Sequence, residues 1–498
     1  MQPLPSPFAT SDVGKPARSG RARLSTPRKT NGDDVTTQPI QEVADFLADP
    51  VQAADFPETI LRFRNDRAVA EIGLESLSDQ DWLRHFGRFT PVAGNLPEPL
   101  ALRYHGHQFR VYNPEIGDGR GFLFAQLKDA RGRWLDLGTK GSGQTPHSRF
   151  GDGRLTLKGG VREILASEML EALGVNTSRT FSLIETGEEL HRGDEPSPTR
   201  SAVMVRMSHG HIRIGSFQRL AYLREEDGLK RLTDYALRTY FGSASGDPVE
   251  LVRHVVEGTA RLAASYMAAG FVHGVLNTDN INITAESFDY GPWRFAPTFD
   301  PNFTAAYFDH AGLYAFGRQA EAIQWDVVQL AGALRTIADV DALIPELDRF
   351  GPLYSDALVE RFLWRLGVEP RGGEEDIQLV AAIEQGLIGT GAQVDRFFFD
   401  WAGGKRRVSS DGYQVEAFAP FRERVARYRQ ARTLDHPYWE GEPCSMHIEE
   451  VEAIWAPIAE RDDWSALEAK VEQVRTMGEA LKLPLPFGKG GSREAGAG

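Results

Sequence analysis

Two short segments hold side chains suited to a hard metal ion. HGVLNTDN, residues 273–280, ends in Asn280, and FDYG, residues 288–291, places Asp289 nine positions further on. Mg²⁺ prefers oxygen ligands and takes only a few of them from a protein. The amide oxygen of Asn280 and the carboxylate of Asp289 therefore form a candidate ligand pair. The histidines of the chain form no HExxH-like metal motif.

The first segment is close to the catalytic loop of a kinase but differs from it at one position. Kinase-type loops have an aspartate two residues after the histidine and an asparagine several residues later. Here Val275 occupies the aspartate position, and the only acid, Asp279, is directly beside Asn280. The segment is thus a disabled kinase loop, a coincidence, or a working site for a different reaction. His273 itself is expected to be a packed structural residue.

The tetrapeptide GDGR occurs twice, at residues 117–120 and 151–154. A Gly-x-Gly turn lets backbone N–H groups approach a bound anion, and arginine can pair with phosphate through two parallel hydrogen bonds. Either copy alone is more typical of a simple turn. Two copies on either side of Lys140 favour phosphate binding. The chain contains no GxxxxGK[ST] sequence, which excludes an ordinary P-loop.

Other charged residues could join a phosphate site. Lys140 ends a predicted strand, and Glu163 lies early in the following predicted helix. Kinases hold the nucleotide phosphates with such a lysine–glutamate pair, although two surface charges would have the same spacing. Arg206 and Arg213 lie seven residues apart on a predicted strand–loop–strand. They would either contact phosphate or remain solvated.

The elements that must position these residues follow a clear order, with strands first and helices later. One prominent helix interrupts the strands, and it ends before Gly174, a helix terminator. From about residue 230 the apolar spacing is mainly helical. Strands are predicted within 100–140, with a hairpin-like turn at 129–132, and at 179–187 and 201–208; helices are predicted at 160–173 and 250–270. A small β-rich lobe is therefore followed by a larger helical lobe.

Composition restricts the possible function classes. The chain has 498 residues, of which 41% are hydrophobic and 25% charged, as in ordinary soluble globular proteins. The formal net charge of −14 argues against a general nucleic-acid binder. The chain contains no run of about 18 apolar residues, so we expect no transmembrane helix. The single cysteine, Cys444, excludes an intramolecular disulfide and a Cys-built zinc site, and it fits a reducing compartment.

The two ends differ from the rest of the chain. Residues 1–40 are rich in Ser, Thr, Pro and Arg, with six basic residues against three acidic ones. This composition predicts a disordered tail. An organellar presequence is the alternative, although the segment lacks an amphipathic apolar stripe. Residues 486–498 contain GKGGSREAGAG and are predicted to be a flexible end.

The order of the motifs resembles the selenoprotein O (YdiU-like) family of enzymes, which have a pseudokinase fold and transfer AMP from ATP to protein hydroxyl groups. The resemblance runs over roughly residues 95–330. It rests on YHGHQF (104–109), GDGR (117–120), LGTKGSGQTPHSRFGDGR (137–154), VREILASEMLEALGV, GFVHGVLNTDNINI (270–283), FDYGP (288–292) and DHAGLYAFGRQ (309–319). The C-terminal third departs from the family, and Cys444 lies far from the end, where family members can carry a redox residue.

The resemblance implies a role for each matching residue. Asp279 is expected to be the catalytic base. Asn280 and Asp289 are expected to hold Mg²⁺, with Mn²⁺ as the alternative ion. Contacts with ATP are expected from Gly117, Gly119, Arg120, Lys140, Asp152, Gly153, Arg206, Arg213 and Asp289, with Glu163 paired to Lys140. In the family the nucleotide lies flipped relative to ordinary kinases, so that the α-phosphate faces attack. The reacting phosphorus would then lie elsewhere than in a kinase, so the acid that accepts the proton must lie elsewhere too. This would explain why Val275 occupies the usual aspartate position.

The resemblance also implies an α+β, protein-kinase-like (pseudokinase) bilobal fold with a C-terminal helical extension. We expect an N-lobe with the nucleotide-binding elements at 41–225, a C-lobe with the catalytic loop and metal site at 226–430, and the extension at 431–485.

The expected function is that of a protein adenylyltransferase, which moves AMP from ATP to Ser, Thr or Tyr hydroxyls and releases pyrophosphate. A kinase-like phosphotransferase and a catalytically silent pseudokinase scaffold are the alternatives. Val275 counts against the first, and the joint presence of Lys140, Glu163, Asp279, Asn280 and Asp289 counts against the second. We expect a monomer that binds ATP and protein substrates, but neither nucleic acid nor membrane. The expected compartment is the cytoplasm, or the mitochondrion for a eukaryotic source.

Overall fold

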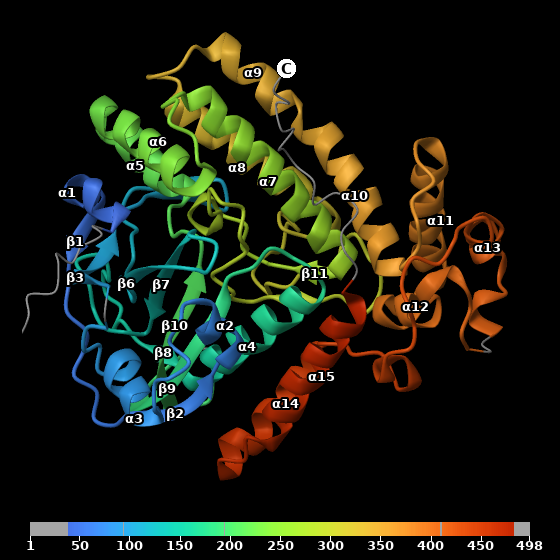
Figure 1. The fold of residues 1–498 in the computed structure, drawn as a ribbon, viewed down its shortest axis with the longest axis horizontal. Helices are drawn as coiled ribbons and strands as arrows, with labels where there is room; N and C mark the ends of the chain where they lie inside the picture. Colours follow the sequence, from blue (N-terminus) through green and yellow to red (C-terminus); the bar gives the residue numbers. More distant parts are fainter. Residues whose placement is uncertain (1–37, 93, 194, 409–410, 483–498) are drawn as a thin grey trace, which may run out of the picture. The chain divides into compact units, whose positions relative to one another are not determined.

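The computed structural model describes residues 38–482 except residues 93, 194 and 409–410 (Figure 1). The predicted basic tail, apart from its last three residues, and the predicted flexible end lie outside these residues. The described part mixes helix and sheet, with most strands before most helices. The α+β class is therefore confirmed.

One antiparallel sheet forms the first part of the structure. Its order is β1-β3-β6-β7-β10-β9-β2, and β8 pairs with β10. The strands are β1 (Ala48–Pro50), β2 (Ile60–Arg64), β3 (Asn95–Leu102), β6 (Leu123–Lys128), β7 (Trp134–Lys140), β8 (Leu155–Thr156), β9 (Arg179–Leu190) and β10 (Thr199–Ser208). These bounds confirm the strands predicted in 100–140, 179–187 and 201–208, and the turn at 129–132 joins β6 to β7.

Both faces of the sheet are buried. Alternate side chains of a strand point to opposite faces, so one strand contributes to the packing on both sides. Along β10, Ala202 and Met204 pack into the core shared with the helices. Val203, Val205 and Met207 pack on the opposite side, in a cluster that also contains Trp82 and Phe86. β7 pairs with β10 at the centre of the sheet, with Lys140 opposite Met204 and Gly138 opposite Arg206. The end of β7 and the middle of β10 are thus held in a fixed register.

Helix α4 (Leu157–Ala172) crosses one face of this sheet, as Figure 1 shows. It begins three residues earlier than the predicted 160–173, because the Thr156 hydroxyl accepts a hydrogen bond from Gly159 N (3.1 Å) and caps the helix. Gly174, with φ of +70°, follows its end as predicted. Val161, Ile164 and Leu165 are fully buried against the sheet side. Glu163 is therefore fixed at the sheet–helix boundary.

A two-stranded hairpin stands apart from the main sheet. It consists of β4 (Gly106–Gln108) and β5 (Val111–Asn113), with Gln108 paired to Val111. The two turn residues between them are Phe109 and Arg110, and both have a positive φ, of 50° and 63°. The hairpin packs against the short 3-10 helix Thr278–Asn280.

The second part of the structure is helical. Its central helix, α7, is packed against α8 and α10 (Figure 1). The helices of the described residues are α1 (Ala44–Leu47), α2 (Asp66–Glu71), α3 (Asp79–Trp82), α5 (Ile214–Leu223), α6 (Glu226–Phe241), α7 (Pro248–Ala269), α8 (Gln319–Leu334), α9 (Val340–Asp348), α10 (Phe350–Leu366), α11 (Glu374–Thr390), α12 (Val394–Asp400), α13 (Ala419–Val425), α14 (Ile448–Arg461) and α15 (Ser465–Leu481). Two short strands, β11 (Phe271–Val272) and β12 (Arg294–Phe295), follow α7. The helix predicted at 250–270 is α7.

The predicted strand–loop–strand around Arg206 and Arg213 is wrong in its second half. Arg206 lies on β10, but Arg213 immediately precedes α5. Ile214, Phe217 and Leu220 are all fully buried, and their spacing is that of a helix face. The segment thus forms a strand–loop–helix.

The last two helices, α14 and α15, pack against α4 (Figure 1). Arg475 on α15 pairs with the buried Glu168 of α4 (Nη2–Oε1 2.6 Å), and Lys158 at the start of α4 pairs with Glu452 on α14 (2.7 Å). Cys444, just before α14, is buried, and burial raises the pKa of its thiol to about 12. The boundaries expected at 225/226 and 430/431 stay predictions. Among the described residues, no helix is long and apolar enough to cross a membrane.

Candidate active site

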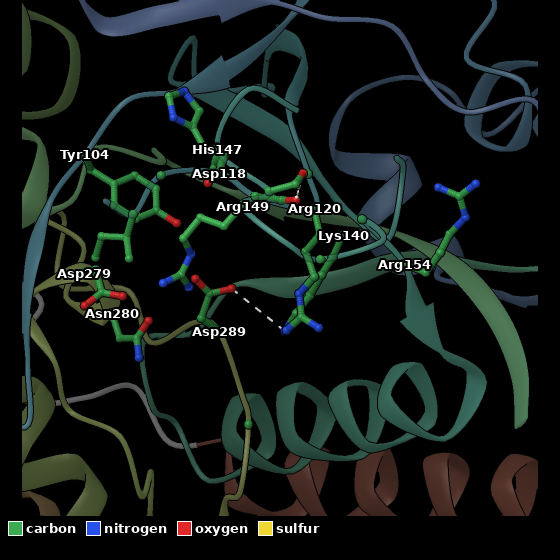
Figure 2. Close-up of a pocket in the computed structure, with 18 of the residues that line it drawn as sticks. Tyr104, Asp118, Arg120, Lys140, His147, Arg149, Arg154, Asp279, Asn280 and Asp289 are labelled. Carbon is green, nitrogen blue, oxygen red and sulfur yellow. Dashed lines mark hydrogen bonds and ion pairs between the residues drawn. The ribbon is translucent and has the colours of Figure 1, made fainter. Parts of the chain in front are cut away.

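A cavity of about 710 Å³ lies where the sheet meets the segment 275–291 (Figure 2). Seven cationic side chains line it, against four acidic ones. A cavity with this excess of positive charge is suited to a polyanionic ligand. The cations are Arg120, Lys140, Arg149, Arg154, Arg192, Arg206 and Arg213, and the acids are Asp118, Asp152, Asp279 and Asp289.

The predicted pair of Lys140 and Glu163 is present. Lys140 is the last residue of β7, and its Nζ donates to Oε1 of Glu163 on α4. Lys140 Nζ also lies 3.9 Å from Asp289 Oδ1. Burial and the neighbouring Arg120 lower the pKa of Lys140, whereas Asp289 acts in the opposite direction. The pair is thus an internal feature of the site, and the alternative of two surface charges is wrong.

Asp289 is the point where the two parts of the structure meet. Its Oδ1 accepts from Arg206 Nη1, and its Oδ2 accepts from Arg213 Nη1 at 2.6 Å. Burial alone would raise the pKa of this carboxyl, but Arg206, Arg213 and Lys140 together hold it well below its usual range. Asp289 has a φ of +60°, which is uncommon for a residue other than glycine and costs about 1 kcal/mol. The surrounding ion pairs hold it in this conformation.

Asp279 lies in the 3-10 helix Thr278–Asn280, and its carboxyl is held loosely. Its Oδ2 accepts from Gln108 Nε2 at 3.4 Å, and its buried Oδ1 has no hydrogen-bond partner. Burial raises the pKa of Asp279 to about 6, although Arg213 opposes this shift. A Cβ on Gly106 would come within 2.8 Å of Oδ1, so the hairpin backbone lies directly against the carboxyl. A carboxyl with such a pKa has the chemistry of a proton acceptor near neutral pH.

Asn280 and His273 hold the backbone around Asp279. The Asn280 Nδ2 donates to Val275 O at 2.9 Å, which leaves the amide oxygen as the free side-chain group at the cavity. His273 is buried, and its Nε2 lies 3.0 Å from Phe288 O, the residue before Asp289. His273 thus ties the two loops together and does not line the cavity, in agreement with the expected packed role.

The first GDGR turn presents its arginine to the cavity. Arg120 is exposed there, and among the residues that the structure describes it forms no ion pair. Gly117 and Gly119 face the segment 147–148, where a Cβ on Gly117 would come within 2.5 Å of the His147 ring. Glycine is required at position 117 because a side chain there would collide with this ring.

The second GDGR turn also lines the cavity, but its charged groups are already paired. Asp152 accepts two hydrogen bonds from Arg192, at 2.8 and 3.1 Å. Arg154 donates through Nε and Nη2 to Glu188 at 2.9 Å. Figure 2 shows the Arg154 guanidinium turned away from Asp289. Gly153 has a φ of +71° and packs against the backbone of Gly143.

The structure thus brings all the predicted site residues together, with Glu163 behind Lys140 and the others at the cavity wall. Sequence reasoning missed several cavity residues, which are Tyr104, Gln108, Asp118, His147, Arg149 and Arg192. Tyr104, Gln108 and His147 lie within the family-like segments YHGHQF and LGTKGSGQTPHSRFGDGR, which was the available signal. Arg192 lies in a loop without any motif.

Within residues 38–482, apart from the four undescribed positions, no three His, Cys, Asp or Glu side chains are grouped to hold a metal ion. A cation that takes few protein ligands remains compatible with the donors present. The Asn280 amide oxygen is free for such a role, and each Asp289 oxygen keeps a second lone pair beside its arginine bond. The buried Asp279 Oδ1 without a partner is a further oxygen nearby. These oxygens fit a Mg²⁺ ion, which takes few ligands from a protein.

Comparisons with known proteins agree over most of the chain. The sequence profile of the family described as "Protein adenylyltransferase SelO" matches residues 34–436. A "Protein nucleotidyltransferase YdiU" from Synechococcus elongatus is 43% identical over 472 residues, which cover 87% of this chain and 93% of that protein. The protein of the same name from Synechocystis sp. is 48% identical over 350 residues, covering 68% and 72%. The one from Gloeobacter violaceus is 43% identical over 454 residues, covering 87% and 93%.

Proposed function

We propose that this chain, which belongs to the protein adenylyltransferase SelO family, is an enzyme that transfers AMP from ATP to hydroxyl groups of proteins and releases pyrophosphate. The observation that carries the proposal is the position of Asp279. Its buried carboxyl, with one oxygen free, lies at the wall of a cavity in which cations outnumber acids. The same cavity thus provides cations that neutralise a triphosphate and a base that accepts the proton of a hydroxyl group.

The reaction needs a proton acceptor and charge neutralisation, and the chain's own residues supply both. Asp279 accepts the proton of the acceptor hydroxyl as its oxygen attacks the α-phosphorus. The new bond joins this oxygen to phosphorus, and the bond from phosphorus to the pyrophosphate oxygen breaks. Arg120 and Lys140 neutralise the charge that builds up on the leaving pyrophosphate. Arg206 and Arg213 keep Asp289 ionised and in place.

Asn280 and Asp289 are the residues that would hold Mg²⁺, or Mn²⁺ as the alternative. When bound, the ion would offset the negative charge of the phosphates. The pKa of Asp289, held well below its usual range, keeps this carboxylate available as a ligand throughout the physiological pH range.

We further propose that the fold is kinase-like, with a nucleotide held between an N-lobe (41–225) and a C-lobe (226–430). The order of the site residues along the chain supports this proposal. A strand lysine pairs with a helix glutamate, and a loop asparagine and a later aspartate follow at the same cavity. Val275 occupies the position that holds an aspartate in kinase loops. It lies at the cavity wall, and its side chain cannot accept a proton. This residue favours AMP transfer over phosphoryl transfer.

The acceptor residue type (Ser, Thr or Tyr), the monomeric state and the cytoplasmic location stay predictions. A kinase-like phosphotransferase and a silent scaffold remain the competing hypotheses, and one experiment separates all three. The protein is incubated with Mg²⁺ and a protein mixture, with ATP labelled on the α-phosphate in one arm and on the γ-phosphate in the other. Label from the α-position alone supports AMP transfer, label from the γ-position alone supports a kinase, and no label in either arm supports a scaffold.

Two variants test the assigned residues in the same assay. Asp289→Ala should abolish metal-dependent labelling, and Asp279→Asn should lower it by a factor of about 100 or more while ATP still binds. Asp356→Ala, an exposed position on α10, is the matched control and should label like the unmodified protein. Wild-type labelling by Asp289→Ala would show that the metal assignment is wrong.

A further inference from the structure

Two groups of aromatic side chains lie at the β4–β5 hairpin beside Asp279. We call them together the aromatic belt, which consists of Phe109, Tyr112, Tyr222, Tyr307, Phe308 and Trp325. In the first group Tyr307 contacts Phe308 (centroids 5.1 Å apart), which contacts Phe109 (5.8 Å). In the second group Tyr222 stacks on Tyr112 (5.5 Å). The His107 ring lies 5.0 Å from Tyr112 and 5.1 Å from Trp325. The Arg110 guanidinium, 5.4 Å from the Trp325 ring, connects this second group to its sequence neighbour Phe109.

The belt is unusually open to solvent for its residue types. Tyr307 is 83% exposed and Tyr222 is 58% exposed, and the neighbouring Val111 is 70% exposed. Isolated exposed apolar residues are common on protein surfaces, but several such residues gathered at one hairpin mark an interaction surface. Aromatic side chains are also the types enriched at the centres of protein interfaces.

The belt is joined directly to the candidate active site through the β4–β5 hairpin. His107 N donates to Thr278 Oγ1 at 2.7 Å, and Phe109 N donates to Asn277 Oδ1 at 3.1 Å. Gln108, between them, donates to Asp279 Oδ2. Three consecutive hairpin residues therefore bind three consecutive residues of the catalytic loop, and the side chains of the hairpin extend the site towards the surface.

The hairpin turn keeps large side chains where glycine would be favoured. Two-residue turns with positive φ at both positions prefer Asn-Gly or Gly-Gly, yet here they hold Phe109 and Arg110. Each costs about 1 kcal/mol relative to an unstrained conformation. The two side chains make the contacts that complete the belt, since Phe109 meets Phe308 and the Arg110 guanidinium lies 5.4 Å from the Trp325 ring. Strain retained at this position indicates a role for these side chains.

Charge on the belt is partly compensated. Arg110 pairs with Glu321 on α8 (Nη2–Oε1 3.1 Å), and Arg318 lies 3.5 Å from the other oxygen of the same carboxylate. The belt itself thus offers mainly aromatic and aliphatic contact. An apolar segment would bury the exposed rings.

We propose that the aromatic belt binds the segment of the protein substrate that flanks the acceptor hydroxyl, and that it selects aromatic or branched aliphatic side chains in that segment. The proposal rests on the proposed AMP transfer and assigns the protein-binding surface of the same site. The acceptor hydroxyl reaches Asp279 past Gln108 while its neighbours lie on the belt. The occupant is a substrate segment, rather than a second copy of this chain.

A peptide library tests the proposal. Peptides carry Ser, Thr or Tyr at a fixed central position with all other positions degenerate, and AMP transfer is followed with ATP labelled on the α-phosphate. The unmodified protein should favour aromatic or branched aliphatic residues near the acceptor by about threefold or more. Val111→Asp and Tyr307→Asp should remove this preference and lower labelling about tenfold. Both side chains are exposed, so neither variant should change the unfolding temperature.

Controls distinguish the possible outcomes. Ile377→Asp on α11, at a position 51% exposed, should label like the unmodified protein, and the ATP affinity of all three variants should be unchanged. Unchanged peptide preference in both Val111→Asp and Tyr307→Asp overturns the proposal. A shift from dimer to monomer in these two variants, measured by analytical ultracentrifugation, also overturns it, because the belt would then bind a second copy. A complete lack of α-label in every peptide despite ATP binding overturns the proposed function instead, and this inference falls with it.

Discussion

The two GDGR turns have the same sequence and line the same cavity, yet their arginines have different surroundings. In the first turn Arg120 is open to the cavity, without an ion pair among the described residues. In the second, Arg154 is bound by Glu188 and Asp152 by Arg192. Arg120 of the first turn can therefore pair with a ligand, whereas the charged groups of the second turn are already paired within the protein. Identical tetrapeptides acquire different roles from their neighbours.

Replacing a glycine in each turn by alanine should give the largest difference between the turns, measured as the free energy of unfolding. A Cβ on Gly153 would lie 2.2 Å from the Gly143 carbonyl carbon, and its φ of +71° is unfavourable for alanine. Gly153→Ala should lower the free energy of unfolding by about 3 kcal/mol or more. Gly119→Ala should cost about 1 kcal/mol, because the nearest atom is 3.0 Å away and its φ is not positive. Urea denaturation measures both, and equal losses would contradict the structural role assigned to the second turn.

The next effect concerns the arginines and ATP. Arg120→Ala should weaken ATP binding about 100-fold, since a charge-assisted hydrogen bond to phosphate contributes about 2–3 kcal/mol. Arg154→Ala should change the ATP affinity by less than about threefold, because Glu188 already occupies its guanidinium. Isothermal titration with ATP and Mg²⁺ decides between them. A large loss with Arg154→Ala would mean that the ligand displaces Glu188.

A smaller effect should come from reversing the ion pair of the second turn. Arg154→Glu places two carboxylates together and should destabilise the fold by about 1 kcal/mol. Adding Glu188→Arg restores opposite charges and should recover most of that loss, which thermal unfolding of the single and double variants would reveal. Failure of the double variant to recover would indicate that Arg154 is held by packing on Phe56 instead of by charge.

The smallest expected difference is in pH dependence, where the two turns should behave alike. Burial raises the pKa of Asp279 from 3.8 to about 6, so kcat should rise with pH through a midpoint near 6 as the base loses its proton. Arg120→Ala should lower the plateau, and neither it nor Arg154→Ala should move the midpoint appreciably. A midpoint near 4 in the unmodified protein would contradict the raised pKa of Asp279, and a midpoint that Asp279→Asn leaves unchanged would exclude Asp279 as the base.

The same raised pKa affects stability with a definite sign. Between about pH 4 and pH 6 the native state holds a proton on Asp279 that the unfolded chain has released. The free energy of unfolding therefore falls as pH rises through this window. Asp279→Asn removes the titrating group, so its stability should depend less on pH there, and calorimetry at pH 4 and pH 7 measures the difference.

The sequence was sufficient for features that repeat or that follow a regular element. Lys140 and Glu163 could be paired because one ends a strand and the other begins the next helix. The pairing of Arg192 with Asp152 could not be predicted, because the two residues are 40 positions apart and both lie in loops. The hairpin at 106–113 carries positive φ at two bulky residues, which no turn preference indicates. Arg213 was misplaced because the residues around it, where helix α5 begins at Ile214, were interpreted as a second strand.

Helix α4 has a consequence for how the protein is made. Glu163 lies on this helix, yet the side of α4 away from the sheet is covered by α14 and α15, and Glu168 meets Arg475 307 residues later in the chain. During translation, every residue expected to contact the nucleotide leaves the ribosome long before the helices that pack against α4. A chain that stops short of residue 448 would contain the whole cavity wall, but the buried carboxylate of Glu168 would lack its partner Arg475. Arg475 therefore supports the helix that carries Glu163 from a point 307 residues away from Glu168 in the sequence.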